Sequence, residues 1–111
     1  MNQDMRNKIN NIIQKNNIVL FMKGTPDTPM CGFSASVINI LKILKVKFVG
    51  INILDSDELR SGIKEYSDWP TIPQLYIDKV FVGGCDIVQE MYSNGSLQLL
   101  LSSNDKDIIA Y

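Results

Sequence analysis

Residues Ile18–Met22 read Ile-Val-Leu-Phe-Met, five apolar side chains in succession. A strand with one face in water alternates apolar and polar residues, so a short run that is apolar throughout predicts a strand buried on both faces. Helices must then cover both faces of the sheet. We expect the first of them to end near Asn16-Asn17. Apolar residues recur at helical spacing before and after the strand, namely Met5, Ile9, Ile12 and Ile13 on one side and Val37, Ile40, Leu41 and Leu44 on the other.

The chain then repeats this alternation of strand and helix. Lys47–Ile53 predicts a second strand, and Asp55–Glu58 predicts a helix N-terminus, because Glu58 follows Asp55 by three residues and acids occupy the first turn. We expect this third helix to run to about Ser67. The order helix, strand, helix, strand, helix predicts two parallel strands joined by a helical crossover.

The last part of the chain has a different pattern. Gln74–Ile77 and Val80–Val82 are separated only by Asp78-Lys79, a spacing that is typical of a hairpin and therefore of antiparallel strands. The fold class expected is α/β, with a four-stranded mixed sheet in which a parallel pair and an antiparallel hairpin are flanked by helices. Two further helices complete the chain, one from Cys85 to about Ser93 and a short one that contains Leu97, Leu100 and Leu101.

Length and charge narrow the class of protein. At 111 residues the chain is long enough for one domain with one core. Its net charge of −1 gives no basic surface for nucleic acid or an anionic membrane. No apolar run approaches the roughly 20 residues of a membrane span, and Met1–Arg6 lacks the character of a signal or transit peptide. We expect no nucleic-acid or membrane partner and a cytoplasmic protein, or a mature protein of an organellar matrix.

Cys31 lies in a loop that joins the apolar strand to the second helix. A helix N-terminus offers unpaired N–H groups and the positive end of the helix dipole, and Lys23 adds a charge nearby, so the pKa of this thiol is expected to be low. The alternative is a small buried residue, but Pro26, Pro29 and Gly32 favour an exposed loop. Ser34 occupies the place of the second cysteine of a CxxC motif, which excludes a dithiol cycle.

The other residues that could bind metal are few. The chain has two cysteines, which lie 54 positions apart and do not form the disulfide pattern of a secreted protein. It has no histidine. The absence of histidine excludes Cys-His zinc sites and Ser-His-Asp or Cys-His hydrolase sites. One chain cannot supply four soft ligands to a zinc ion or an iron–sulfur cluster, so any such site needs ligands from elsewhere.

Four segments together resemble one family, the monothiol glutaredoxins of the Cys-Gly-Phe-Ser type. They are KGTPDTPMCGFS at 23–34, Arg60 in the third helix, WPTIPQLYI at 69–77 and VGGCDIV at 82–88. The similarity extends from about residue 5 to residue 101, as one glutaredoxin domain within 1–111. It implies a thioredoxin fold with a glutathione groove at Cys31. It also implies a homodimer that holds a [2Fe-2S] cluster with one Cys31 and one glutathione thiol from each subunit.

The resemblance also assigns roles to single residues. Lys23 and Arg60 would pair with the glycine carboxylate of glutathione, although charged residues are more often solvated surface. Cys85 is expected as a partly buried residue at a helix start rather than a cluster ligand. Ile72–Pro73 matches the cis-proline of the family, whereas base rates alone predict a trans bond. The resemblance also assigns Thr71 and Ile72 to the cysteine backbone of glutathione. Its γ-glutamyl end would meet Gly84, the Cys85 N–H and Asp86. The residues expected to support the site are Gly32, Phe33, Trp69 and Pro73.

Three functions follow from these residues. The first is a glutathione-dependent carrier that passes a [2Fe-2S] cluster to apo iron–sulfur proteins, with a BolA-like protein as a further partner that the family suggests. The second is a thiol–disulfide oxidoreductase that removes glutathione from mixed disulfides through Cys31. The third is a redox sensor that uses Cys31 and Cys85, which requires their Cα atoms to lie within about 7 Å. The missing second thiol and the long Gly24–Met30 loop favour the carrier over the enzyme.

Overall fold

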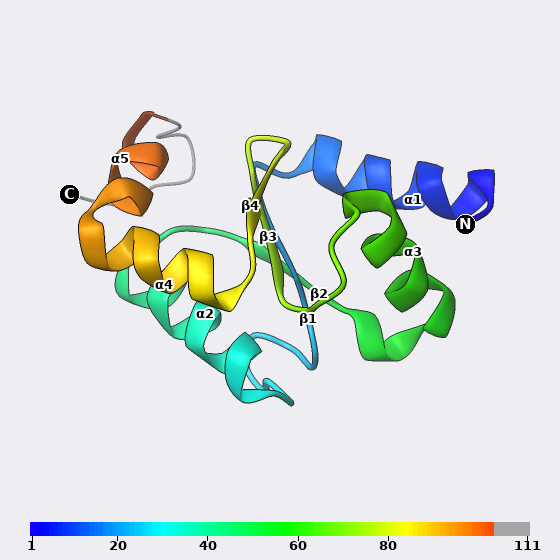
Figure 1. Cartoon of the computed structure of the whole chain (residues 1–111), viewed down its shortest axis with the longest axis horizontal. Coiled ribbons are helices and arrows are strands. Elements are labelled where there is room, and N and C mark those ends of the chain that lie inside the picture. The colour runs from blue at the N-terminus through cyan, green and yellow to red at the C-terminus, as the bar shows by residue number, and fades with distance from the viewer. Residues whose placement is uncertain (104–111) are drawn as a thin grey trace.

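The computed structural model describes residues 1–103, and no helix within them is long and apolar enough to span a bilayer. Helices and strands alternate in the first two thirds of this range and a hairpin and two helices follow, as the sequence predicts (Figure 1). The elements are α1 (Gln3–Lys15), β1 (Ile18–Met22), α2 (Gly32–Ile43), β2 (Val49–Asn52), the 3-10 turn η1 (Ile53–Asp55), α3 (Asp57–Ser67), β3 (Gln74–Ile77), β4 (Val80–Gly83), α4 (Cys85–Asn94) and α5 (Ser96–Ser103).

The strands form one mixed sheet in the order β2-β1-β3-β4. β1 pairs with β2 in parallel and with β3 in antiparallel fashion, and β3 and β4 form an antiparallel hairpin. This arrangement confirms the expected parallel pair plus hairpin. Helices α1 and α3 lie on one side of the sheet, and α2, α4 and α5 lie on the other (Figure 1).

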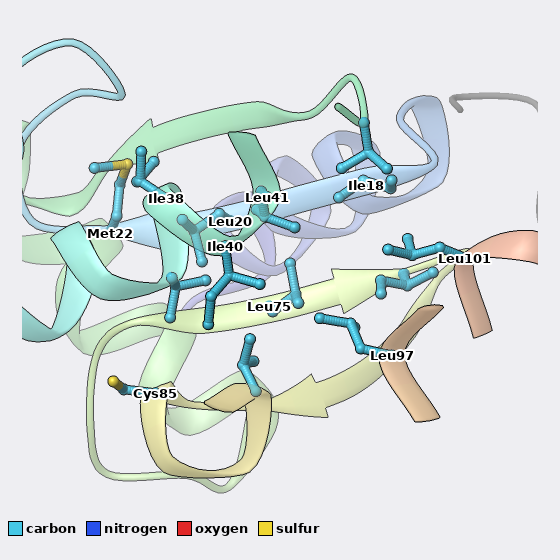
Figure 2. Close-up of a cluster of buried hydrophobic side chains, with 14 residues drawn as sticks. Ile18, Leu20, Met22, Ile38, Ile40, Leu41, Leu75, Cys85, Leu97 and Leu101 are labelled. Carbon is cyan, nitrogen blue, oxygen red and sulfur yellow. The ribbon is translucent and has the colours of Figure 1, made fainter. Parts of the chain in front are cut away.

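The central strand β1 divides the core into two clusters. All five of its residues are buried, and successive side chains point to opposite faces of the sheet. Ile18, Leu20 and Met22 pack with α2, α4 and α5 in the cluster shown in Figure 2, whereas Val19 and Phe21 pack with α1 and α3. The prediction that this run is buried on both faces is confirmed.

Both ends of β2 and the start of α3 differ from the sequence prediction. Strand β2 begins at Val49 rather than Lys47 and ends at Asn52, so it is shorter than expected. The expected cap at Asp55 is wrong by one residue, because Ser56 is the N-cap of α3 and its Oγ accepts a hydrogen bond from the Leu59 N–H at 3.2 Å. Asp55 instead belongs to η1, where its carboxylate accepts a bond from Asn52 Nδ2.

The hairpin between β3 and β4 turns through Asp78 and Lys79, with φ of 51° and 71°. Two successive left-handed residues characterise the type I′ turn, whose twist matches that of the strands it joins. The turn therefore forms without a glycine. It lies at the far end of the sheet from the Cys31 loop (Figure 1).

Candidate functional site

Cys31 is the N-cap of α2 and lies where the loop from β1 enters the helix. Its backbone is extended, with φ of −151° and ψ of 137°, and its thiol is partly exposed. Gly32 and Phe33 begin the helix, and the Phe33 ring is 63% exposed. The loop thus presents the thiol at the surface, as the two prolines and the glycine predict.

The surroundings of the Cys31 sulfur favour its ionised form. Partial burial on its own raises the pKa of this thiol. The backbone N–H groups of Ser34 and Phe33, the charge of Lys23 and the Ser34 hydroxyl act in the opposite direction and outweigh burial, so the pKa of Cys31 is lowered. The helix N-terminus and Lys23 therefore have the effect that the sequence predicts, and the thiolate that attacks disulfides and binds metals is favoured.

Ser34 joins the thiol to the end of β1. Its side chain is fully buried, and its Oγ accepts a hydrogen bond from the Lys23 N–H at 3.2 Å. A bond across eleven residues fixes the start of α2 against the residue that follows β1. The position of a second CxxC cysteine is therefore occupied by an inward-facing hydroxyl that supports the site.

A groove of about 450 Å³ opens beside Cys31. Five segments of the chain meet there: the residue after β1, the start of α2, the last turn of α3, the 69–73 segment and the start of α4. Its lining residues are Lys23, Cys31, Phe33, Lys64, Trp69, Pro70, Thr71, Ile72, Pro73, Gly84, Cys85, Asp86 and Ile87. Most of the residues that the sequence marks as a site are therefore brought together, while Gly32 and Arg60 lie outside the lining.

The charged residues of the groove differ from the expected set in one respect. Lys23 and Asp86 line it, but Arg60 is exposed on α3 outside the lining. Lys64 lines the groove instead, and it follows Arg60 by four residues, which places both on one face of α3. The role of Arg60 stays a prediction, and Lys64 is a groove residue that sequence reasoning missed although the spacing could have indicated it.

The 69–73 segment forms one wall of the groove, and the Ile72–Pro73 bond is cis. The resemblance implied this isomer, and the expectation from base rates is wrong. Gln74 is fully buried and its Nε2 donates to the carbonyl oxygens of Trp69 at 3.2 Å and Thr71 at 3.3 Å. The Gln74 amide thus holds the 69–73 segment in place. Sequence analysis did not use this signal, a polar residue within an otherwise apolar strand.

The start of α4 also lines the groove. Gly84 is the N-cap, and a Cβ on it would lie 3.2 Å from the Pro73 carbonyl oxygen, so the two walls approach closely at this residue. Cys85 is only 8% exposed, and this burial is the main reason why its pKa is raised. The charges of Asp86 and Cys31 raise the pKa of Cys85 further, whereas a hydrogen bond with the Ser36 side chain lowers it. Both cysteines are free, and burial and the raised pKa of Cys85 favour its neutral thiol form.

A family model, related sequences and solved structures all indicate the same family for this chain. The glutaredoxin family model matches residues 18–82. A probable monothiol glutaredoxin 2 of Rickettsia typhi is 54% identical over 98 residues, which are 88% of each chain. Among solved structures, reduced apo GrxS14 from poplar has a TM-score of 0.80 at 49% identity and covers 89% of this chain and 91% of its own. A monomeric truncated mutant of 1-C-Grx1 from Trypanosoma brucei has a TM-score of 0.86 at 37% identity, with 96% of each chain covered.

We expect Cys31 to react with iodoacetamide at lower pH than Cys85, with each thiol followed separately by peptide mass spectrometry. Lys23→Met should raise the pH at which Cys31 alkylation reaches half its maximal rate, because a positive charge that stabilises the thiolate is lost. Lys8→Met, an exposed substitution on α1, is the control and should leave the profile in place. A Cys31 profile that Lys23→Met does not shift would contradict the electrostatic account.

Proposed function

Because the chain belongs to the glutaredoxin family, and within it to the monothiol glutaredoxins, we propose that it binds a [2Fe-2S] cluster with glutathione and transfers it to apo iron–sulfur proteins. The observation that carries this proposal is a single thiol of lowered pKa, Cys31, at the rim of a groove whose charges match those of glutathione. The cluster is the cargo of this reaction, and glutathione is the cofactor that helps to hold it.

The number of thiols in the chain sets the composition of the complex. A [2Fe-2S] cluster takes four soft ligands, but the chain has two cysteines and no histidine. Cys85 is buried in the groove wall with a raised pKa, which leaves Cys31 as the thiolate that each chain offers. Two chains supply two thiolates, and two glutathione thiols complete the set. The proposal therefore requires a homodimer in the cluster-bound form.

The groove fits the chemistry of glutathione, which carries two carboxylates, one ammonium group and one thiol. Lys23 and Lys64 suit the glycine carboxylate, and Arg60 on the same face of α3 is the third cation we assign to it. Asp86, in the first turn of α4, suits the γ-glutamyl ammonium, while the N–H of Cys85 at the helix start suits the neighbouring carboxylate. These charges fix the two ends of the tripeptide.

The middle of glutathione would lie along the 69–73 segment. We assign its cysteine backbone to the backbone of Thr71 and Ile72, in the manner of an added strand. Gln74 keeps this backbone in place through the carbonyl oxygens of Trp69 and Thr71. The indole N–H of Trp69 is buried in the same wall and has no acceptor among residues 1–103. With its ends and backbone held, the glutathione thiol comes to the side of the groove where Cys31 lies.

Exposure of the site suits transfer to another protein. Cys31 is partly exposed, and the side chains of Met30 and Phe33 beside it are 66% and 63% exposed. Ligands at the surface, half of them on a dissociable tripeptide, can be exchanged for the thiolates of an apo-protein. A BolA-like protein in place of one subunit is a further proposed partner, and a reducing compartment, the cytoplasm or an organellar matrix, is the proposed location because it keeps both thiols free.

The lowered pKa of Cys31 also favours a second activity, deglutathionylation. The Cys31 thiolate would attack the glutathione sulfur of a protein–glutathione disulfide, release the protein thiolate and form a Cys31–glutathione disulfide. A second glutathione thiolate would then attack the same glutathione sulfur, form glutathione disulfide and return the Cys31 thiolate. Ser34 in place of a second thiol makes this cycle depend on external glutathione at every turn.

Cys31→Ser should abolish cluster binding, because each subunit then loses its thiolate ligand. The measurement is anaerobic reconstitution with iron, sulfide and glutathione, followed by visible absorption and native mass. Cys85→Ser is the matched control; it keeps the backbone N–H at the start of α4 and should keep the colour. Loss of the cluster in Cys85→Ser with retention in Cys31→Ser would reverse the ligand assignment.

Lys64→Ala and Arg60→Ala should each raise the glutathione concentration that cluster assembly requires. A hydrogen bond to a charged group is worth about 1.5–3 kcal/mol, so the rise should be roughly tenfold or more. Arg60→Lys should recover part of the loss, because lysine keeps the charge but not the planar fork. Lys15→Ala on α1 is the control. Thermal stability of the apo-protein should change little, and an unchanged glutathione dependence would remove that residue from the site.

A further inference from the structure

Gln74, the first residue of β3, carries a side-chain amide that is fully buried. Its Nε2 donates to the carbonyl oxygens of Trp69 and Thr71, and its Oε1 accepts a hydrogen bond from the Tyr76 hydroxyl at 3.3 Å. Backbone carbonyl oxygens only accept hydrogen bonds, so the amide must turn its nitrogen toward them and its oxygen toward Tyr76. Without the hydroxyl, Gln74 Oε1 would be a buried acceptor that has lost its partner, which is costly.

The bond to Thr71 also fixes the direction of the next backbone N–H. The Thr71 carbonyl and the Ile72 N–H belong to one trans peptide plane, in which C=O and N–H point in opposite directions. Because Gln74 holds the carbonyl oxygen, the Ile72 N–H is directed away from Gln74. Thr71 and Ile72 both line the groove, and the Ile72 N–H has no acceptor within residues 1–103. A fixed donor of this kind is what an added extended peptide requires.

The Tyr76 hydroxyl is itself held in place. Tyr76 is only 3% exposed, and its ring packs against Phe21 and Phe81, with centroids 5.7 Å and 5.3 Å apart. Burial raises the pKa of Tyr76 to about 12, although a hydrogen bond with the Ser67 side chain opposes this rise. The hydroxyl is therefore protonated at physiological pH and remains a donor to Gln74.

We propose that Tyr76 is a positioning residue for the glutathione site. Its hydroxyl orients the Gln74 amide, the amide holds the Thr71 carbonyl oxygen, and the same peptide plane then presents the Ile72 N–H to the cysteine backbone of glutathione. Neither Tyr76 nor Gln74 lines the groove, so both act through the backbone and not by contact with the ligand. The identity of the ligand rests on the proposed function, whereas the chain of contacts from Tyr76 to Thr71 does not.

Tyr76→Phe gives a direct test, because it removes the hydroxyl and keeps the ring in its aromatic contacts. Tyr66→Phe is the matched control, since the Tyr66 hydroxyl donates to Asn10 Oδ1 on α1 at 3.2 Å and Tyr66 does not line the groove. NMR of the reduced apo-proteins gives the hydrogen-exchange rate of the Gln74 side-chain amide. A titration with S-methylglutathione gives the affinity; this probe keeps both ends and the cysteine backbone of glutathione but has no thiol for a cluster or a disulfide.

Tyr76→Phe should speed exchange of the Gln74 Nε2 protons, shift the Ile72 N–H resonance and weaken S-methylglutathione binding roughly three- to tenfold, the worth of one net hydrogen bond. Tyr66→Phe should change none of these quantities. In a Gln74→Leu background, Tyr76→Phe should add little further loss of affinity, because the amide that the hydroxyl orients is already gone. A hydroxyl that acted only through general stability would instead give additive losses.

A Tyr76→Phe protein with the exchange rate and affinity of the unaltered protein would overturn the proposal, as would losses that are fully additive with those of Gln74→Leu. If Tyr76→Phe does not fold, the unaltered protein decides. A slowly exchanging Tyr76 hydroxyl proton supports the bond to Gln74, and exchange as fast as that of a hydroxyl in water contradicts it. If the unaltered protein binds no S-methylglutathione, the proposed function fails, and exchange of the Gln74 amide in Tyr76→Phe still decides whether Tyr76 orients it.

Discussion

The N-terminal turn of α2 lowers the pKa of the Cys31 thiol, and the other features of the site depend on how the chain delivers that turn to the end of β1. Burial opposes ionisation, so the N–H groups of Phe33 and Ser34 and the charge of Lys23 must stay close to the sulfur. Ser34 Oγ fixes the turn to the backbone of Lys23. The buried strand β1, covered by helices on both faces, gives these contacts a rigid base.

Both proposed functions use the Cys31 thiol, and its surroundings favour one of them. As a nucleophile it has no partner thiol, because Ser34 occupies that position and Cys85 is buried with a raised pKa. As a ligand it lies in a groove that is lined by two lysines and by an acid at the start of α4. A thioredoxin fold with one partly exposed thiol of lowered pKa beside a groove of this charge suits the proposed sharing of a cluster between two chains.

The sequence predicts most of the fold because its patterns are local. The unbroken apolar run of Ile18–Met22, the two-residue hairpin turn and the thiol at a helix start are each visible within a few residues. The cap of α3 was misplaced because Asp55 and Ser56 are both good caps and the 3-10 turn decides between them. Lys64 in the groove and the hydrogen bond between Asn52 and Gly24 depend on contacts across the fold, and the latter joins residues 28 apart.

Native mass spectrometry of the anaerobically reconstituted protein tests the central claim most directly, with glutathione in one sample and dithiothreitol at matched thiol concentration in the other. The account predicts a coloured species of two chains, one [2Fe-2S] cluster and two glutathione molecules, and little stable cluster with dithiothreitol alone. Equal yield and spectrum without glutathione, or a coloured monomer, would contradict it, because the cluster would then not need glutathione or a second chain to complete its four ligands.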